Sequence, residues 1–436
     1  MIPKDALSGV RVCDLSWIVA APTATRYMAN FGAEVIRVEY AQTLDSLRIG
    51  PVSGKIGFDP SPNRGTAFNF WNNSKQGITL NVRHPKGWDI LMTLIRISDI
   101  IAENYAADVL SNWGLTYDEM KKINPSIIYL KMSGFGAPGS GRNWHYTTWG
   151  PTAAANSSLT FMSGLPGMPP AGYGFSYMDH LAGYWGFIAA LAALRYRHRT
   201  GKGQWIDMSQ VEAGIPLTGA TIPDYSVNGR VYRRPDYPPG NRSIYPAVAP
   251  HNAYRCLPKP IPTVPPTDDR WVVISCFSEA HWKGLCEVMG NPEWTKDPKF
   301  ADMYRRKQNE NELDRNIEAW TKTQKAEDVM WACQGAGLPA GVVQDPQDRA
   351  DFDPQFKARG FYVELTNPEF GTFRYEGVPF QLSKTPASPR KHAPLVGEWN
   401  DQFFLEYLGI SQEEYDEFKA EGVVQDMGFP QYRTGG

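Results

Sequence analysis

The residues that build disulfide frameworks and metal sites are scarce in this sequence. Its five cysteines are scattered without a Cys-x-x-Cys motif, and its seven histidines show no spacing typical of metal ligands. These patterns argue against a disulfide framework and against a bound metal. Unpaired cysteines are typical of a reducing compartment, so the expected location is the cytoplasm.

An excess of charge of one sign is also missing, as is a long apolar run. The 44 basic and 46 acidic residues give a net charge of −2, which predicts no nucleic-acid partner. The longest strongly apolar run, residues 184–194, is too short to span a bilayer. Residues 1–5 contain no apolar stretch of the signal-peptide type. We therefore expect no association with a membrane.

A strand–helix–strand pattern opens the chain. Residues 9–14 and 34–39 are short apolar runs typical of buried strands, and residues 21–30 between them predict a helix. Such a unit favours a parallel sheet. The first turn, residues 15–21, lacks the Gly-x-Gly-x-x-Gly motif, which argues against an NAD-dependent dehydrogenase.

The same alternation continues to about residue 135 and predicts an α/β fold. Further strands are expected at residues 78–82, 100–104 and 126–132, and helices at residues 84–96 and 181–198.

The composition changes after residue 214. Residues 215–270 are rich in Pro, Tyr and Asn and predict a linker with long loops. A chain of 436 residues is expected to hold two or three domains. The predicted organisation is a large domain beginning with residues 1–214, a small domain at 271–335, and a return to the large domain over 336–436. Within the small domain we expect a strand at residues 271–276 and helices at 281–289 and 309–322.

Asp179 lies immediately before the long apolar run. An acid at the start of a helix is either an N-cap or a reactive carboxylate, and position alone favours the cap. As a nucleophile, Asp179 would gain from the positive end of the helix dipole. The following backbone N–H groups would then stabilise developing oxyanions.

Several segments in order resemble the class III CoA-transferases, which include formyl-CoA transferase, crotonobetainyl-CoA:carnitine CoA-transferase and alpha-methylacyl-CoA racemase. The resemblance covers almost the whole chain. It implies a Rossmann-like large domain made from both chain ends, a smaller inserted α+β domain, and two subunits interlocked as rings. The matching segments are residues 7–16, 32–39, 73–83, 98–105, 133–136, 199–204, 206–213 and 393–400.

The resemblance also implies a site. Asp179 matches the catalytic aspartate of the family, and coenzyme A (CoA) thioesters would be substrates with no permanently bound cofactor. Tyr40 replaces an arginine that relatives often carry near the adenine, so its ring is expected to stack there. The residues implied to bind CoA are Val19, Ala20, Tyr40, Leu80, Asn81, Val82, Arg83, Asn104 and Tyr105.

Two further positions lack the basic residues that relatives often have, namely Asn112 and Thr147. Arg48, Arg83 and Arg142 are candidate substitutes for phosphate binding, although a solvated surface role fits each of them as well.

Trp149 separates two branches of the family. The racemases carry a catalytic histidine thirty positions before the aspartate, where this chain has Trp149. Tryptophan has no titratable nitrogen and cannot act as a general base. His145 is a shifted candidate, but the unbroken spacing from Trp149 to Asp179 favours a loop histidine.

The sequence therefore predicts a CoA-transferase that moves CoA from an acyl-CoA to a carboxylic acid through aspartyl anhydride and aspartyl-CoA thioester intermediates. The alternatives are an acyl-CoA racemase, one subunit of a hetero-oligomer instead of a homodimer, and a CoA-binding protein without activity, which an intact Asp179 disfavours. Aromatic residues suggest a bulky or aromatic acid of the benzylsuccinate type, although core packing explains them equally well. The proposed substrate pocket holds Trp17, Trp149 and Tyr177, with Trp144, Tyr146, Tyr173 and Phe175 nearby.

Overall fold

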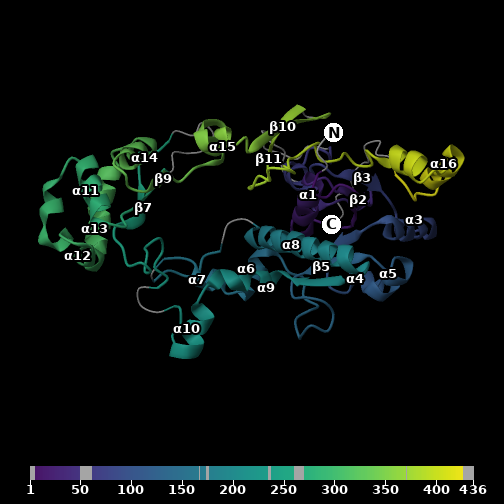
Figure 1. The fold of residues 1–436 in the computed structure, drawn as a ribbon, viewed down its shortest axis with the longest axis horizontal. Helices are drawn as coiled ribbons and strands as arrows, with labels where there is room; N and C mark the ends of the chain where they lie inside the picture. Colours follow the sequence, from purple (N-terminus) through teal and green to yellow (C-terminus); the bar gives the residue numbers. More distant parts are fainter. Residues whose placement is uncertain are drawn as a thin grey trace. The chain divides into compact units, whose positions relative to one another are not determined.

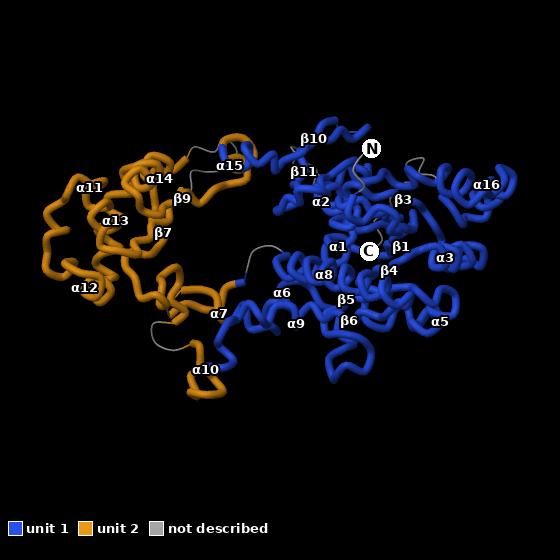
Figure 2. Tube along the Cα trace, in the orientation of Figure 1, with its two compact units in different colours: residues 1–161, 172–224, 354–436 blue, residues 162–171, 225–353 orange. Residues whose placement is uncertain are grey.

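The computed structural model describes residues 5–49, 61–165, 167–172, 176–233, 237–259, 270–369 and 371–425. The chain divides into two compact units (Figure 2). The larger unit contains residues 1–161, 172–224 and 354–436, and the smaller unit contains residues 162–171 and 225–353. Tyr173 and Phe175, two of the aromatic residues expected near the substrate, lie outside the described residues.

A six-stranded parallel sheet forms the centre of the larger unit, in the order β3-β2-β1-β4-β5-β6 (Figure 1). This is the strand order of doubly wound nucleotide-binding folds, whose ligands bind at the carboxyl ends of the strands where the order reverses. Here the reversal falls between β1 and β4. The predicted α/β fold with a parallel sheet is confirmed. The strands are β1 (Arg11–Asp14), β2 (Glu34–Glu39), β3 (Gln76–Thr79), β4 (Ile100–Glu103), β5 (Ile128–Ser133) and β6 (Trp205–Ser209).

Both faces of this sheet are covered by apolar side chains, because successive residues of a strand point to opposite faces. Val12 and Ile100 lie in a core shared with α1 (Ala20–Asn30) and α8 (Tyr177–Thr200). Their neighbours Cys13 and Ile101 lie in a second core. That core is completed by α3 (Pro85–Ile97), α5 (Tyr117–Ile123), η6 (Gln402–Tyr407) and α16 (Gln412–Ala420).

Glycine lets α8 lie close against α1 (Figure 1). A Cβ atom on Gly183 would stand 2.5 Å from the Cβ of Thr23 and 2.8 Å from the carbonyl oxygen of Ala20. Any larger residue would therefore push the two helices apart. This packing brings the second turn of α8 next to the first turn of α1.

The first turn of α8 differs from the prediction. The helix begins at Tyr177, with Ser176 as its N-cap, so Asp179 is its third residue. The interpretation of Asp179 as an N-cap is therefore wrong. The backbone N–H groups of Asp179 and His180 both donate to the carbonyl oxygen of Ser176. They are not available for the oxyanions that the sequence analysis assigned to them.

The smaller unit contains a three-stranded antiparallel sheet in the order β7-β8-β9. Residues 337–343, where the sequence predicts a return to the large domain, include β9 (Ala340–Val342), which pairs with β8 (Trp271–Ser275). The described part of residues 215–270, the predicted linker, includes η2 (Ile215–Thr218), α10 (Thr221–Asn228) and β7 (His251–Arg255). The helices of the unit's core are α11 (Glu279–Val288), α13 (Glu310–Thr321) and α14 (Ala326–Gly335).

Within the described ranges, no helix has both the length and the apolar character needed to cross a membrane. The remaining helices and strands are short. They comprise η1 (Ser46–Arg48), α2 (Thr66–Asn72), α4 (Val109–Asn112), α6 (Gly150–Asn156), α7 (Leu159–Met162), α9 (Gln210–Gly214), η3 (Glu293–Lys296), η4 (Pro298–Phe300), α12 (Met303–Gln308), η5 (Asp348–Phe352), α15 (Pro354–Ala358), β10 (Tyr362–Asn367) and β11 (Gly371–Glu376).

Candidate active site

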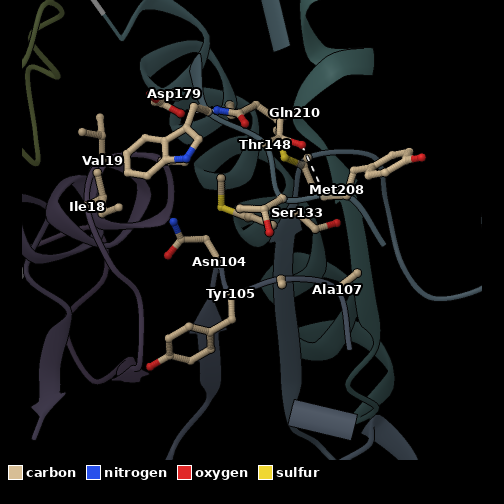
Figure 3. A pocket seen from close by; sticks show the side chains of 18 residues that line it. Ile18, Val19, Asn104, Tyr105, Ala107, Ser133, Thr148, Asp179, Met208 and Gln210 are labelled. Atoms are coloured by element: carbon tan, nitrogen blue, oxygen red, sulfur yellow. Dashed lines mark hydrogen bonds between the residues drawn. The ribbon is translucent and has the colours of Figure 1, made fainter. Parts of the chain in front are cut away.

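A cavity of about 140 Å³ opens at the carboxyl ends of the central strands (Figure 3). Asp179 and Gln210 lie together on one side of it, and the ring of Tyr105 lies on the opposite side (Figure 3). The position agrees with the expected ligand site of a doubly wound sheet. The lining is drawn from the turn after β1, the segment after β4, the ends of β5 and β6 with the residues that follow them, residues 146–149 and the first two turns of α8.

The Asp179 carboxylate has a neutral hydrogen-bonding partner. Its Oδ1 atom accepts from the side-chain amide of Gln210, and none of the ion pairs within the described part of the chain includes Asp179. Burial raises the pKa of Asp179 above its usual range. Hydrogen bonds from Gln210 and Ser176, and the electrostatic effect of His180, oppose that rise. The result is a partly desolvated carboxylate that faces a cavity.

Gln210 is a site residue that the sequence analysis missed. It follows β6 directly and is 6% exposed. It lies 31 positions from Asp179 in the sequence, so no local spacing links the two residues. The available signal is its place at the carboxyl end of a strand in a parallel sheet, where polar side chains reach the ligand site.

The turn between β1 and α1 forms one wall of the cavity and is held by two side chains. Asn104 Oδ1 accepts from the backbone N–H of Trp17 at 2.7 Å, and Asn104 Nδ2 donates to the Trp17 carbonyl oxygen at 2.8 Å. Ile18 has a positive φ of 63°. Its N–H donates to Asp45 Oδ2 at 2.9 Å. A non-glycine residue is strained in that conformation, so these contacts fix the turn.

Buried ion pairs stand behind this turn. Asp14 accepts from Lys75 Nζ at 2.9 Å, and Asp45 accepts from Arg37 at 2.7 Å. Burial alone would raise the pKa of Asp14, but the charges of Lys75 and Arg37 hold it below its usual range. Burial lowers the pKa of Lys75 to about 8. Each charge therefore has a partner of opposite sign.

A second cavity, of about 320 Å³, shares Tyr105 with the first. It contains Trp17, which the sequence analysis placed in the substrate pocket. Most of its lining is aromatic or aliphatic; Glu39 and Arg83 are its charged members, and Thr43 and Asn81 are polar. Of the residues predicted to bind CoA, the structure gathers Tyr40, Leu80, Asn81, Val82, Arg83 and Tyr105 here, and Val19, Ala20, Asn104 and Tyr105 around the Asp179 cavity.

The structure separates the two other residues predicted to form the substrate pocket. Trp149 lines the Asp179 cavity and is 61% exposed. Tyr177 is 44% exposed and lines neither cavity. Among the described residues, no group of three or more His, Cys, Asp or Glu side chains has the arrangement of a metal site.

The three arginines predicted as candidate phosphate ligands differ in their exposure and in their position relative to the cavities. Arg48 is buried and donates to both oxygens of Glu39, at 2.9 and 2.5 Å, so it is neither at the surface nor open to a ligand. Arg83 is exposed and borders the second cavity. Arg142 is exposed and lines neither cavity, and Asn112 bonds to Asp108 at 3.0 Å.

Comparison with known proteins identifies the class of enzyme. The family model described as CoA-transferase family III matches residues 7–400. A succinyl-CoA–D-citramalate CoA-transferase from Chloroflexus aurantiacus is 31% identical over 97% of this chain and 99% of its own. A formyl-CoA:oxalate CoA-transferase from Afipia carboxidovorans is 29% identical over 97% of this chain and 98% of its own.

Solved structures agree. The crystal structure of a CAIB/BAIF family protein from Brucella suis superposes with a TM-score of 0.80 and 27% identity, covering 92% of this chain and 99% of that one. The chain belongs to CoA-transferase family III, which is a family of enzymes. The resemblance inferred from the sequence motifs is confirmed.

Proposed function

We propose that this protein moves CoA from an acyl-CoA to a free carboxylic acid, with Asp179 as the nucleophile. The observation that carries the proposal is the Asp179 carboxylate, partly buried beside a neutral amide and facing the cavity. A desolvated carboxylate is a stronger nucleophile than a hydrated one. The residues expected to bind CoA surround this cavity and its neighbour.

The proposed reaction begins when an Asp179 oxygen attacks the thioester carbonyl. The carbon–sulfur bond breaks, giving a mixed anhydride and the CoA thiolate. The thiolate then attacks the aspartyl carbonyl, which releases the donor carboxylate and leaves an aspartyl-CoA thioester. Each nucleophile is already an anion, so no proton is removed by a base.

The second half reverses these steps with the acceptor. Its carboxylate attacks the aspartyl-CoA carbonyl and displaces the thiolate, forming a second anhydride. The thiolate attacks the acceptor carbonyl, and the new acyl-CoA leaves with Asp179 regenerated. Negative charge develops on carbonyl oxygens at every step, and the Gln210 amide is a hydrogen-bond donor at the right place to stabilise it.

The backbone at the start of α1 is a further donor. Val19 occupies the N-cap position without a side-chain hydrogen bond, and both Val19 and Ala20 line the cavity. The first N–H groups of a helix lack partners within the helix and attract anions. We place the thiolate or a CoA phosphate near them.

The second cavity suits the adenosine end of CoA. Trp17, Tyr40 and Trp113 supply aromatic surfaces, and Arg83 supplies an exposed cation. Aromatic faces stack on an adenine ring, and a guanidinium pairs with phosphate. The acid itself is expected to be bulky or aromatic, the class to which benzylsuccinate belongs, because Trp149 and Tyr146 line the cavity around Asp179.

Racemisation is the competing reaction, and it requires a second proton-transferring group. Trp149 lines the cavity at the position where racemases carry histidine, and His145 is not among the lining residues. The protein is incubated with a chiral 2-methylacyl-CoA in deuterated water. We expect no deuterium at the α-carbon, whereas incorporation that depends on Asp179 would move the assignment to the racemases.

We also propose an interlocked homodimer in the cytoplasm. α8 exposes Trp185 and Ile188, at 45% and 53%, which is unusual for large apolar side chains of one helix. All five cysteines are buried and free, as expected in a reducing compartment. Light scattering should show a dimer. A stable active monomer, or activity only after addition of an unlike subunit, would contradict the homodimer.

The direct test of the function is a screen of carboxylic acids with succinyl-CoA and acetyl-CoA as donors. We expect new acyl-CoA to form with at least one acid, and Asp179→Asn to abolish its formation. Equal product formation by the two proteins would refute the proposed role of Asp179.

A further inference from the structure

Gly150 lies against the carboxylate of Asp179. A Cβ atom on this glycine would stand 2.9 Å from Asp179 Oδ2 and 3.7 Å from Asp179 Cγ, so the close contact is with the oxygen. The same Cβ would stand 3.5 Å from Ser176 Cα, which is an ordinary van der Waals distance. Packed atoms do not approach to 2.9 Å in this way, so one of the two groups would have to move. A side chain at position 150 would therefore compete with Asp179 for the same space.

The backbone at position 150 does not itself require glycine. Gly150 is buried and is the first residue of α6, with Trp149 at the N-cap position. Its φ is not positive, so any residue can adopt this conformation. Alanine also favours a helix more than glycine does. Since neither the conformation nor helix formation calls for glycine, the contact with Asp179 is the feature of the structure that explains it.

The two oxygens of the carboxylate contact two different helices. Oδ1 accepts a hydrogen bond from Gln210, the first residue of α9, and Oδ2 faces Gly150 of α6. The helices α6, α8 and α9 meet in one apolar core, which contains Ala153, Met178 and Val211. Because this core fixes the three helices relative to one another, it also fixes the space between Gly150 and Gln210.

We infer that Gly150 is a positioning residue for Asp179, because its lack of a side chain lets the carboxylate keep the orientation in which it binds Gln210 and faces the cavity. This inference rests on the proposed function and adds a residue to it. The tip of an aspartate side chain moves more easily than packed helices. A Cβ at position 150 would therefore turn the carboxylate and leave the fold in place. Misplacing a reacting group by about 1 Å can cost on the order of 100-fold in rate.

Gly150→Ala tests the inference, with Gly335→Ala as the matched control. Gly335 is the last residue of α14, its φ is not positive, and a Cβ there would meet no atom within 4 Å. CoA transfer is measured with the donor and acceptor found in the screen of acids. We expect kcat of Gly150→Ala to fall by on the order of 100-fold.

The other measurements separate positioning from damage to the fold. KM for the acyl-CoA should stay unchanged in Gly150→Ala, because Gly150 lines neither cavity. Its melting temperature should equal or exceed that of the wild type, because alanine suits the helix. Gly335→Ala should keep the kcat of the wild type. An unchanged kcat in Gly150→Ala, or a melting temperature that falls together with kcat, would overturn the inference.

A double-mutant cycle with Gln210→Met assigns the effect to the carboxylate. If the added Cβ turns Asp179 away from Gln210, removing the Gln210 amide costs little more, so the two losses in kcat should be less than additive. Additive losses would overturn the inference. An inactive Asp179→Asn beside a fully active Gly150→Ala would overturn the inference alone. Wild-type transfer by Asp179→Asn would overturn the proposed function and the inference together.

Discussion

Two aspartates of the larger unit show opposite solutions to the burial of a carboxylate. Asp14, at the end of β1, is fully buried and accepts hydrogen bonds from Lys75, Thr25 and Ser16. Asp179, in the first turn of α8, is partly buried and accepts from the uncharged Gln210 side chain. The pKa of Asp14 is lowered, and the pKa of Asp179 is raised.

The difference lies in the partner and not in the depth of burial. Burial raises the pKa of both groups, but at Asp14 the neighbouring cations outweigh it. A buried carboxylate with a cation stabilises structure only while the pair is complete. A buried carboxylate without a neighbouring cation carries an unpaired negative charge, and reaction with an electrophile neutralises that charge. Asp14 therefore belongs to the scaffold of the turn, and this contrast supports the proposed catalytic role of Asp179.

Replacing the charge at Asp179 should have the largest effect on activity. Asp179→Asn keeps the size of the side chain and removes the anion, so CoA transfer should fall by about 10³-fold or more. The fold should survive, because the raised pKa means that the ionised group opposes folding at neutral pH. We expect a melting temperature equal to or above that of the wild type in thermal denaturation at pH 7.

The same variant fixes the sign of the pH dependence. A carboxyl group whose pKa is raised on folding lowers stability as pH rises through that pKa. The advantage of Asp179→Asn over the wild type should therefore grow with pH and vanish at low pH, where the carboxyl is protonated in both states. An advantage that is largest at low pH would contradict the assignment.

Breaking the ion pair between Asp14 and Lys75 should lower stability, in contrast to the substitution of Asp179. Lys75→Met leaves Asp14 buried without its cation and should lower the free energy of unfolding by about 3–5 kcal/mol, as measured by urea denaturation. The matched control is Lys86→Met, which breaks an exposed ion pair with Glu421 and should leave the free energy of unfolding almost unchanged. Equal losses in the two variants would show that Asp14 does not depend on Lys75.

Substitution of Gln210 should have the smallest effect on activity, and that effect should depend on pH. Its hydrogen bond lowers the pKa of Asp179 against the effect of burial. Gln210→Met removes that hydrogen bond, so the pKa should rise further and the acid limb of the kcat/KM profile should move to higher pH. We expect about a tenfold loss near the limb, which narrows as pH increases. A uniform loss at all pH values would indicate that Gln210 acts only on the developing oxyanions and does not lower the pKa of Asp179.

Much of the scaffold was predictable because it depends on local patterns. The strand at residues 34–39 matches β2, and the helix at 21–30 differs from α1 by one residue. Apolar runs between turn residues determine such elements. The start of α8 was misplaced because Tyr177 and Met178 continue the helix ahead of Asp179, and the cap falls on Ser176.

The partners of the two aspartates were not predictable in the same way. Lys75 is 61 positions from Asp14, and Gln210 is 31 positions from Asp179. No periodicity joins residues that far apart, and the parallel sheet brings them together only after it has formed. The family resemblance implied a role for Asp179 but gave none to Gln210, although the matching segment 206–213 contains it, because that role depends on a contact between α9 and α8.

Trapping the covalent intermediate tests the central claim most directly. The protein is incubated with succinyl-CoA or acetyl-CoA and hydroxylamine, and peptides that contain residue 179 are analysed by mass spectrometry. An anhydride or thioester at Asp179 reacts with hydroxylamine, so we predict a hydroxamate at Asp179 that is absent without acyl-CoA and absent in Asp179→Asn. Transfer of CoA without any modification of Asp179, or a hydroxamate at another residue, would contradict the account.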